Sequence, residues 1–487
     1  MRRSPESIFG GATFDDFLLR PRKSVLASRK YADLAMPLTK NIILPGLPVV
    51  PANMRTVTGG RMAAAAALNG TIAFLPRSYS IDQVVERIRQ VKSLHAHVIE
   101  NPLVIHQKAT LGEARKLIKD KRISGILVES LKGSGILAGI LSRRDLFGPD
   151  SARVEEYMTS FDDVKFGRPD ISIEDAEKML NTIRRQKLPL IDDNRRIVGL
   201  ITMKDLKLAK SKPFTTKDSR GRLVVGATIG ARPGSDYIER AEAVISAGAD
   251  VIMMDVAHAH SVNMEKAIKA FKAEFSGVDL IVGNVATGEG ARFLVNLGAD
   301  AIKVGIGPGR GCRTRLETGF GTPQLEAIRE VYLAIGRRVP VMADGGGRTA
   351  GDVAKAIACG ASTFMLGGLF AGTDEAPGTR YQDPSTGQDM KKYGGETSPE
   401  IKLDQYSAID EPNEDFEGVD NMEGQMRPVP YSGSVSKLFR RLRGSLQSAV
   451  SYGGVKRLAD FHKELTPNIS KYLERLTEAS RKESFDR

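Results

Sequence analysis

Eight short apolar runs recur along the chain, and amphipathic sequence lies between them. The runs are continuous rather than alternating, which is typical of parallel strands buried on both faces. The stretches 237–250 and 288–300 have helical periodicity and end in Gly-Ala-Asp, a helix stop followed by the next run. A repeated strand–helix unit of this kind predicts an α/β fold of the (β/α)8 barrel type. The runs begin at Leu47, Thr71, Leu223, Val251, Leu280, Ala301, Val339 and Thr363.

Polar or glycine-rich clusters follow nearly every run. The carboxyl ends of barrel strands meet at one face, and active sites of barrel enzymes lie there. Turn chemistry alone explains one or two such clusters but not six. The sequence therefore predicts a site at this face, formed by Asn53, Asp255, Asn284, the segment 305–312, Asp344 with the glycines after it, and Gly367 with Gly368.

The sixth run leads into GIGPGRGC, from Gly305 to Cys312, which ends at one of only two cysteines. Glycines let the backbone approach a ligand closely, and loop amides with Arg310, Arg313 and Arg315 nearby favour a reactive thiolate. On spacing alone, a glycine-rich turn with an incidental core cysteine is an equal alternative. The polar strand ends around the loop favour the reactive cysteine.

Composition limits the classes of function. A length of 487 residues suits two or three domains, and two cysteines argue for a reducing compartment. The sequence has no apolar run near the ~20 residues that span a bilayer, no signal-peptide pattern and no C-terminal peroxisomal signal, so we expect a cytoplasmic protein. The net charge of +12 suits anionic ligands such as nucleotides, while the lack of RGG-like or zinc motifs disfavours nucleic-acid binding as the main function.

An internal repeat interrupts the barrel pattern after the second run. ILAGILSRRDL and RIVGLITMKDL each follow a helical pattern, about 60 residues apart. A hydroxyl at a strand end can hold a phosphate, and a carboxylate three residues on can bind ribose hydroxyls. For one copy a capping box at a helix start is the better explanation. The shared residues are Gly139, Ser142 and Asp145 in the first copy and Gly199, Thr202 and Asp205 in the second.

The two copies resemble a CBS-domain pair, which implies a regulatory module for adenine or guanine nucleotides such as ATP or GTP. A barrel split by such a pair, with GIGPGxxC after the sixth strand, resembles the IMP dehydrogenase/GMP reductase family. Further matching motifs are TFDDFLLRP at Thr13, IVGNVATGEGA at Ile281, TGFGTPQ at Thr318 and VPYSGSV at Val429. The implied domains are 1–97, first part of the catalytic barrel; 98–211, the CBS pair (about 98–150 and 155–210); and 212–487, the rest of the barrel with a flap at about 380–430.

The resemblance implies that Cys312 is the nucleophile that attacks C2 of the purine. A thiolate adduct turns one difficult displacement into two easier steps. Thr314 matches a threonine that helps to activate a leaving group or water. Glu400 lies within a residue of the glutamate that serves as proton donor in the reductases, and Glu396 is the nearby rival.

The resemblance also implies binding residues, with Asp344 on the ribose hydroxyls, Tyr393 on the phosphate and Glu423 at the base edge. Arg310 with Gly311 departs from the Ser-Ile that is frequent in the family; we expect the arginine to pair with the phosphate rather than point to solvent. The expected nucleotide contacts are Met54, Arg310, Asp344, Gly345, Gly346, Gly367, Gly368, Tyr393, Gly395, Glu396, Thr397 and Glu423. The nicotinamide cofactor is expected at Asp255, Val256, Ala257, Asn284 and Gly305, and K+ or another monovalent cation at the carbonyls of Gly307, Gly309 and Cys312.

The family contains two activities that share the cysteine adduct. IMP dehydrogenase uses NAD and then hydrolyses the adduct with an Arg-Tyr pair on the flap, whereas GMP reductase releases ammonia from GMP and uses NADPH. Between Arg380 and Arg427 this chain has no arginine, and Asp404 and Gln405 precede Tyr406. The sequence therefore favours GMP reductase, with IMP dehydrogenase as the alternative and a non-catalytic nucleotide-sensing scaffold as a third. A homotetramer or octamer is expected from the family.

Overall fold

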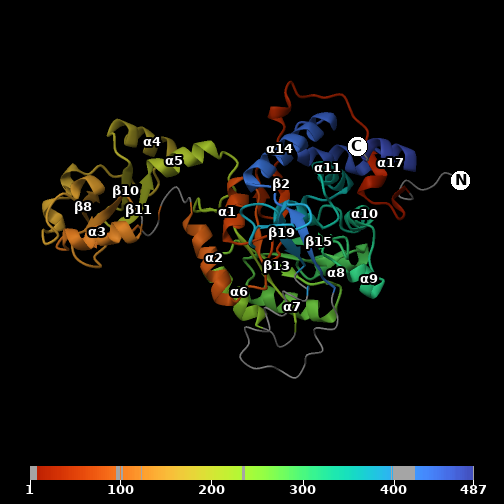
Figure 1. Cartoon of the computed structure of the whole chain (residues 1–487), viewed down its shortest axis with the longest axis horizontal. Coiled ribbons are helices and arrows are strands. Elements are labelled where there is room, and N and C mark those ends of the chain that lie inside the picture. Colours follow the sequence, from red (N-terminus) through yellow and green to blue (C-terminus); the bar gives the residue numbers. More distant parts are fainter. Residues whose placement is uncertain are drawn as a thin grey trace. The chain divides into compact units, whose positions relative to one another are not determined.

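The structure, a computed structural model, describes residues 8–94, 99, 102–121, 123–232, 236–395, 398 and 423–485. The chain divides into two compact units (Figure 1). One comprises Met1–Lys92, Phe214–Asp218 and Leu223–Arg487, and the other comprises Ser93–Pro213 and Ser219–Arg222. The second unit contains the stretch 98–211, in which the internal repeat lies.

An eight-stranded parallel sheet forms the centre of the first unit, in the order β4-β17-β16-β15-β14-β13-β12-β5. Each of the eight apolar runs supplies one strand, so the predicted (β/α)8 barrel is confirmed. The strands are buried along nearly their whole length because helices cover the outside while side chains fill the inside. Their bounds are β4 Val49–Pro51, β5 Phe74–Leu75, β12 Gly226–Ile229, β13 Val251–Asp255, β14 Asp279–Val285, β15 Ala301–Val304, β16 Val341–Asp344 and β17 Thr363–Leu366.

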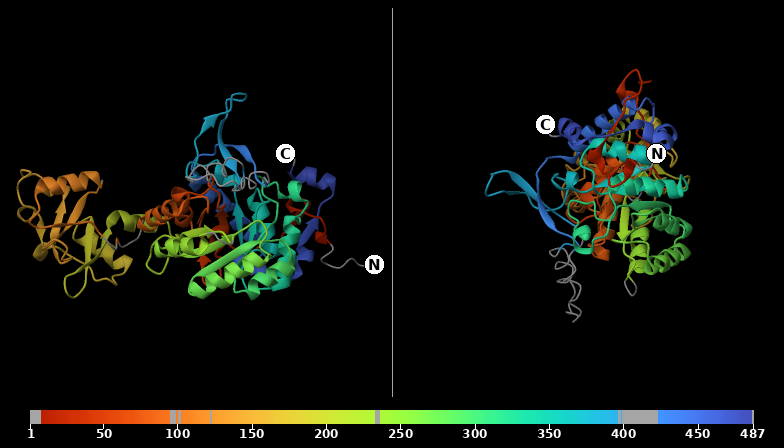
Figure 2. Two further views of the ribbon diagram at one scale, coloured as in Figure 1. Left: turned by 90° about the horizontal axis from the view of Figure 1, so that it is seen from below. Right: turned by 90° about the vertical axis from the view of Figure 1, so that its right-hand side faces the viewer.

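Helices alternate with the strands and surround the barrel (Figures 1 and 2). The expected stops after α6 and α8 are present, because Gly248 and Gly298 follow these helices with φ of 106° and 97°, in the left-handed region that favours glycine. The barrel helices are α1 Gly60–Leu68, α2 Ile81–Ser93, α6 Tyr237–Ser246, α7 Val262–Glu274, α8 Gly288–Asn296, α9 Thr314–Thr318, α10 Gln324–Ile335, α11 Ala350–Cys359 and α12 Gly368–Ala371.

Additional elements extend the barrel unit at its ends and at its site. The antiparallel strands β18 Tyr381–Gln382, β19 Asp389–Gly394 and β20 Met426–Pro430 form a small sheet, whose β18–β19 hairpin projects from the barrel in Figure 2. Helix α14, Val435–Tyr452, packs against α11. The remaining elements are β1 Phe17–Leu19 paired with β21 Leu473–Arg475, β2 Met36–Pro37 paired with β3 Ile43–Leu44, and helices α15 Phe461–Glu464, α16 Ile469–Tyr472 and α17 Glu478–Phe485.

In the second unit, each copy of the repeat folds as a helix followed by an antiparallel strand pair. Thr110 caps the first repeat helix in a capping box with Glu113, and Ser172 caps the second by accepting the Asp175 amide. Each copy has a small apolar core, and a third cluster joins them. The elements are β6 Val104–His106, α3 Leu111–Asp120, β7 Gly125–Glu129, β8 Leu137–Ser142 and β9 Thr159–Ser160, then α4 Ile173–Thr182, β10 Lys187–Ile191, β11 Ile197–Thr202 and α5 Met203–Ser211.

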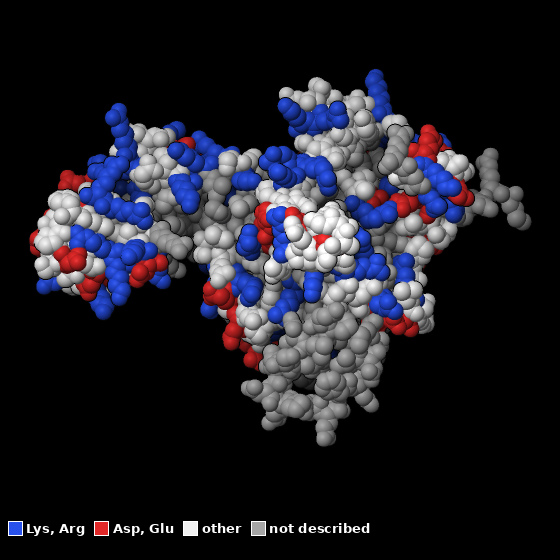
Figure 3. Space-filling model, in the orientation of Figure 1, with Lys and Arg blue, Asp and Glu red and all other residues white. Residues whose placement is uncertain are grey.

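The surface is basic, in keeping with the net charge of +12. Figure 3 shows Lys and Arg side chains in excess over Asp and Glu on the face that it displays. Among the helices of the described residues, none has the length and apolar character needed to cross a membrane.

Candidate active site

The loop after β15 depends on glycine at two positions. Gly305 has a φ of 143°, and a Cβ added there would lie 2.3 Å from the backbone oxygen of Asp344. Gly307 has a φ of 76°, and a Cβ there would meet the Arg315 side chain at 2.4 Å. Any other residue would therefore push this loop away from the neighbouring strand end and from its own support. The glycine pattern of the sequence has this physical origin.

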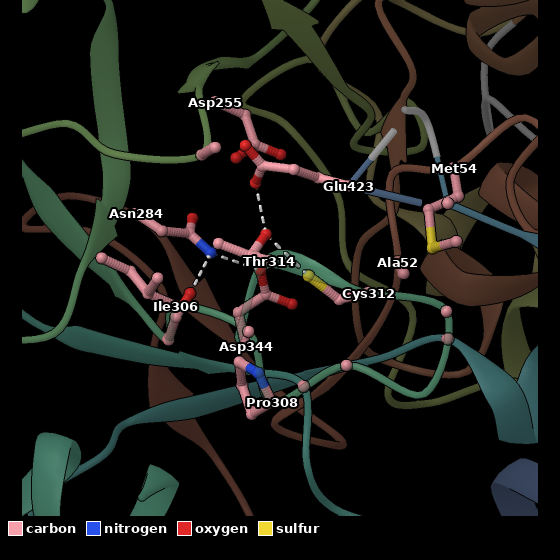
Figure 4. Close-up of a pocket in the computed structure, with 18 of the residues that line it drawn as sticks. Ala52, Met54, Asp255, Asn284, Ile306, Pro308, Cys312, Thr314, Asp344 and Glu423 are labelled. Carbon is pink, nitrogen blue, oxygen red and sulfur yellow. Dashed lines mark hydrogen bonds between the residues drawn. The ribbon is translucent and has the colours of Figure 1, made fainter. Parts of the chain in front are cut away.

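Cys312 ends the loop inside a cavity of about 210 Å³ at the carboxyl ends of the strands. Its amide donates to the Gly309 carbonyl at 3.0 Å, and its Sγ lies 3.1 Å from the Thr314 hydroxyl. Thr314 in turn donates to a Glu423 carboxylate oxygen at 2.5 Å (Figure 4). Because Thr314 donates to Glu423, its oxygen is left to accept a proton from the thiol. The three side chains form a continuous path for a proton.

The position of Glu423 is fixed by backbone contacts as well. Its carbonyl accepts the Arg313 amide at 2.6 Å, and Gly424 pairs with Cys312 across a β-bridge. The segment that enters β20 is thereby joined to the cysteine loop. The sequence assigned Glu423 to the base edge of the nucleotide, and the structure brings its carboxylate to Thr314.

The arginines that follow Cys312 in the sequence make their contacts elsewhere. Arg313 forms an ion pair with Glu317 at 2.6 Å, and the Arg315 guanidinium donates to the Ile306 carbonyl at 3.1 Å. Burial lowers the pKa of Arg315, and the nearby Cys312 opposes this effect. Arg315 therefore supports the fold of the loop. The sequence interpretation grouped these arginines around the thiol; the electrostatic interaction of Arg315 with Cys312 agrees with it, whereas Arg313 pairs with Glu317.

A buried lysine connects the two acidic strand ends of the site. Lys303, on β15, has only 3% of its side chain exposed, and its ammonium lies 3.2 Å from Asp255 and also binds Asp344. It donates to the Asn284 side-chain oxygen at 3.0 Å, while Asn284 donates to Asp344 at 2.9 Å. Burial disfavours the ammonium form, but Asp255 and Asp344 outweigh it and raise the pKa of Lys303. Asn53 completes the network by donating to Asp255 at 2.7 Å.

This network joins residues that the sequence assigned to different ligands. Asp344 was expected at the ribose, and Asp255 and Asn284 at the cofactor. The sequence interpretation missed Lys303, although a lone lysine inside the otherwise apolar run AIKV was a usable signal. It also missed Arg77, which follows β5 and lines the same cavity.

The glycines after β16 and β17 lie at the other end of the cavity. Gly345 and Gly346 have φ of 79° and 84°, and a Cβ on Gly345 would approach the Gly309 backbone to 3.0 Å. Gly367 is so close to Tyr393 that a Cβ on it would lie 2.5 Å from the phenol oxygen. Burial raises the pKa of Tyr393, so its hydroxyl stays protonated and can donate.

Most predicted site residues line one of two adjoining cavities. Met54, Asp255, Val256, Ala257, Asn284, Gly305, Gly307, Gly309, Cys312, Thr314, Asp344, Gly345, Gly367, Tyr393, Gly395 and Glu423 line the first. Arg310, Gly346 and Gly368 line the second, which also contains Gly309, Gly345, Gly367 and Tyr393. Glu396, Thr397 and Glu400 lie outside the described residues.

In the second unit, Ser142 and Asp145 form the capping box that was the alternative for a single copy. The Ser142 hydroxyl and amide both donate to Asp145, each at 2.7 Å. Both residues also line a cavity of about 520 Å³. Thr202 ends β11, and the side chain of Asp205 lies outside the part of the chain that the structure describes.

The fold and the site define the class of protein, a (β/α)8-barrel enzyme with a cysteine loop after its sixth strand. The family model described as "IMP dehydrogenase / GMP reductase domain" matches residues 11–486. The chain belongs to this family, so it is an oxidoreductase of purine metabolism, and its family uses a nicotinamide cofactor and purine nucleotides as substrates. The family predicted from the sequence is confirmed.

The relatives carry both names of the family. Inosine-5'-monophosphate dehydrogenase of Nitrosopumilus maritimus is 38% identical over 454 residues, which cover 91% of this chain and 92% of that protein. The protein of the same name from Aquifex aeolicus is 38% identical, covering 93% and 92%. The structure of a cysteine-to-alanine variant of GMP reductase from Trypanosoma brucei with guanosine 5'-monophosphate is 35% identical, with a TM-score of 0.85 and 97% coverage of both chains.

Proposed function

We propose that this protein is a GMP reductase, which converts GMP, NADPH and a proton to IMP, ammonia and NADP+. The observation that favours the reductase over the dehydrogenase is the arginine-free stretch between Arg380 and Arg427. The hydrogen-bonded path from Cys312 through Thr314 to Glu423 supports the covalent chemistry that both activities share. An amine is a poor leaving group unless it receives a proton, and this path ends in a carboxyl group that Thr314 joins to the reacting sulfur. The lack of any arginine between Arg380 and Arg427 removes the base that the dehydrogenases use for hydrolysis.

The reaction begins with Cys312. Its thiol proton passes through Thr314 to Glu423. The thiolate then adds to C2 of GMP and forms a carbon–sulfur bond, while the electron pair of the C2–N3 double bond moves onto N3. Glu400, the proton donor that the resemblance implied, lies outside the described residues, and we assign this role to Glu423 instead. Thr314 and Glu423 deliver the proton to the 2-amino group, the C2–N3 double bond forms again, the bond from C2 to the amino nitrogen breaks, and ammonia leaves.

Asp255, Val256 and Ala257 would hold a nicotinamide cofactor, which would supply hydride chemistry at C2. Cleavage of the carbon–sulfur bond would then give IMP and return Cys312 to its thiolate.

The residues near Cys312 fit a nicotinamide cofactor. Asp255, Val256 and Ala257 lie at the end of β13 and share the cavity with the cysteine. Asp255 is held by Asn53 and Lys303, so its carboxylate is oriented before a ligand binds. Arg77 lines the same side and supplies positive charge for an anionic dinucleotide.

Glu423→Gln tests the proton path. It keeps the side-chain size but cannot supply the proton, so we expect ammonia release from GMP to fall by about 100-fold or more. Binding of GMP should change little, because the phosphate and ribose contacts lie elsewhere and glutamine keeps a hydrogen-bonding group at the base edge. Glu317→Gln, in α9 directly after the loop and paired with Arg313, is the matched control. Equal turnover in Glu423→Gln and wild type would reject this role of Glu423.

IMP dehydrogenase activity is the alternative, and the names of the curated relatives favour it. In that case Thr314 and Glu423 would activate water for hydrolysis of the adduct. XMP formation from IMP and NAD at a rate comparable with GMP reduction would support this alternative.

We further propose that the segment 98–211 is a CBS-domain pair that binds purine nucleotides such as ATP or GTP. In its support, the cavity of about 520 Å³ is lined by more cations than acids. A charge excess of this kind suits a polyphosphate. The lining includes Arg143, Arg144, Lys165, Arg184, Arg185 and Lys187, against Asp145 and Asp163. From the same resemblance to the family, we also propose that the protein forms a homotetramer or octamer. The carbonyls of Gly307, Gly309 and Cys312 would bind a monovalent cation.

A further inference from the structure

A second cavity continues from the end of the catalytic cavity where the glycine cradle lies. It measures about 560 Å³, and Gly309, Gly345, Gly367 and Tyr393 line both cavities. A nucleotide whose base faces Cys312 and whose ribose reaches Asp344 would therefore direct its 5'-phosphate over these four residues. The second cavity begins at that phosphate and extends away from the base.

Four basic residues line this second cavity, and no acidic residue of the described chain does. Arg348 forms an ion pair with Asp15. Arg310, Lys437 and Arg441 have no ion pair with a carboxylate in the described residues. Lys437 and Arg441 are four residues apart on α14, so they lie on one face of that helix. Basic side chains gather around the position of α14 in Figure 3.

A 5'-monophosphate accounts for only part of this arrangement. The cradle amides, the Tyr393 hydroxyl and Arg310 already provide donors for one phosphoryl group. Lys437 and Arg441 line the cavity from α14, which is not part of the glycine cradle. Two like charges placed together repel each other unless an anion lies between them. The size of the cavity and its remaining positive charge both indicate that a second anionic group binds there, beyond the 5'-phosphate.

We propose that this cavity is a subsite for the outer phosphoryl groups of a purine nucleoside 5'-diphosphate or triphosphate. Such a nucleotide occupies the catalytic pocket itself and excludes the substrate. The inference rests on the proposed function only in that a purine 5'-nucleotide binds beside Cys312. The subsite would let these diphosphates and triphosphates inhibit the enzyme directly, independently of any binding to the inserted unit.

Protection of Cys312 from alkylation tests the subsite without any turnover. Cys359 is fully buried in α11, so Cys312 is the thiol that iodoacetamide reaches in the folded protein. A nucleotide in the catalytic pocket slows the reaction, whereas one bound to the inserted unit leaves the thiol open. Alkylation is followed by mass spectrometry of the Cys312 peptide at increasing GMP, GDP and GTP, with inorganic pyrophosphate as a separate probe.

In the wild type we expect GDP to protect Cys312 at concentrations no higher than those of GMP. In the double variant Lys437→Ala, Arg441→Ala, the half-protecting concentration of GDP should rise by about 10-fold or more, because two charge-assisted contacts are lost. That of GMP should change by less than about 3-fold. Arg440→Ala removes a cation from the same helix outside the cavity and should change neither value.

Three outcomes overturn the subsite: GDP protection at least 10-fold weaker than that of GMP in the wild type, equal losses for GMP and GDP in the double variant, or no loss for either. Arg441→Gln, which keeps most of the side chain, repeats the test if the double variant unfolds. Failure of GMP itself to protect Cys312 would instead contradict the proposed function, so the two results are distinguishable.

Discussion

Replacement of Lys303 by methionine tests how the strand ends of the site are held together. Lys303→Met keeps the buried stem but removes the ammonium that lies between Asp255 and Asp344. Removing one partner of a buried ion pair costs about 3–5 kcal/mol. Asp255 and Asp344 keep 21% and 22% of their side chains exposed, and both retain contacts with asparagines. Water and these contacts reduce the cost, so we expect the free energy of unfolding to fall by about 2–3 kcal/mol in Lys303→Met.

Denaturant unfolding measures this loss. We also expect kcat/KM to fall by about 10-fold or more, because Asp255 and Asp344 lose the group that orients them at the site. The assay is steady-state kinetics with GMP and NADPH, each varied at a saturating level of the other. Without the ammonium the carboxylates of Asp255 and Asp344 repel each other, so the two strand ends should lose their fixed orientation. In the wild type the pKa of Lys303 is raised, so its contribution remains complete through neutral pH and declines only in strong alkali.

A change of kcat/KM below about 3-fold in folded Lys303→Met would refute this reasoning. It would mean that Asp255 and Asp344 are oriented by the asparagines alone. Lys269→Met, which removes an exposed lysine from α7 that pairs with Glu265, is the matched control and should leave the kinetics unchanged.

Three further predictions concern other parts of the chain. Cys312→Ala should abolish turnover while nucleotide binding persists, whereas Cys359→Ala should be nearly silent in activity; more than a few per cent of activity in Cys312→Ala, by NADPH consumption, would contradict the nucleophile. Burial lowers the pKa of His462, so the imidazole takes up a proton more readily in the unfolded chain than in the folded one. The free energy of unfolding should therefore decrease as the pH is lowered below about 6.5. Thermal melts should show a smaller decrease in His462→Asn. Arg143→Ala with Arg185→Ala should weaken ATP or GTP binding to the inserted unit by about 10-fold in calorimetry and leave turnover without effectors intact; unchanged binding would reject that cavity as the effector site.

The barrel was predictable because its strands are buried on both faces, and continuous apolar runs are how such burial appears in a sequence. The polar strand ends were predictable for a related reason, since parallel strands bring their carboxyl ends together. Asn284 and Asp344, which are far apart in the chain, are in hydrogen-bond contact in the structure.

What the sequence did not predict depends on side-chain direction. Arg315 follows Cys312 closely in the chain, yet its guanidinium turns back to the Ile306 carbonyl. The Glu423 carboxylate reaches Thr314 only because the β20 segment pairs with the cysteine loop, a contact between residues far apart in sequence. The role of Lys303 was hidden because its partners come from two other strands.

The most direct test of the central claim compares the two reactions of the family on the same purified protein. GMP with NADPH and IMP with NAD are followed by the absorbance of the reduced cofactor, with ammonia and XMP assayed as the respective products. A GMP reductase consumes one NADPH for each ammonia released and forms negligible XMP. Robust XMP formation from IMP and NAD, with little ammonia released from GMP, would contradict the account and identify the protein as an IMP dehydrogenase.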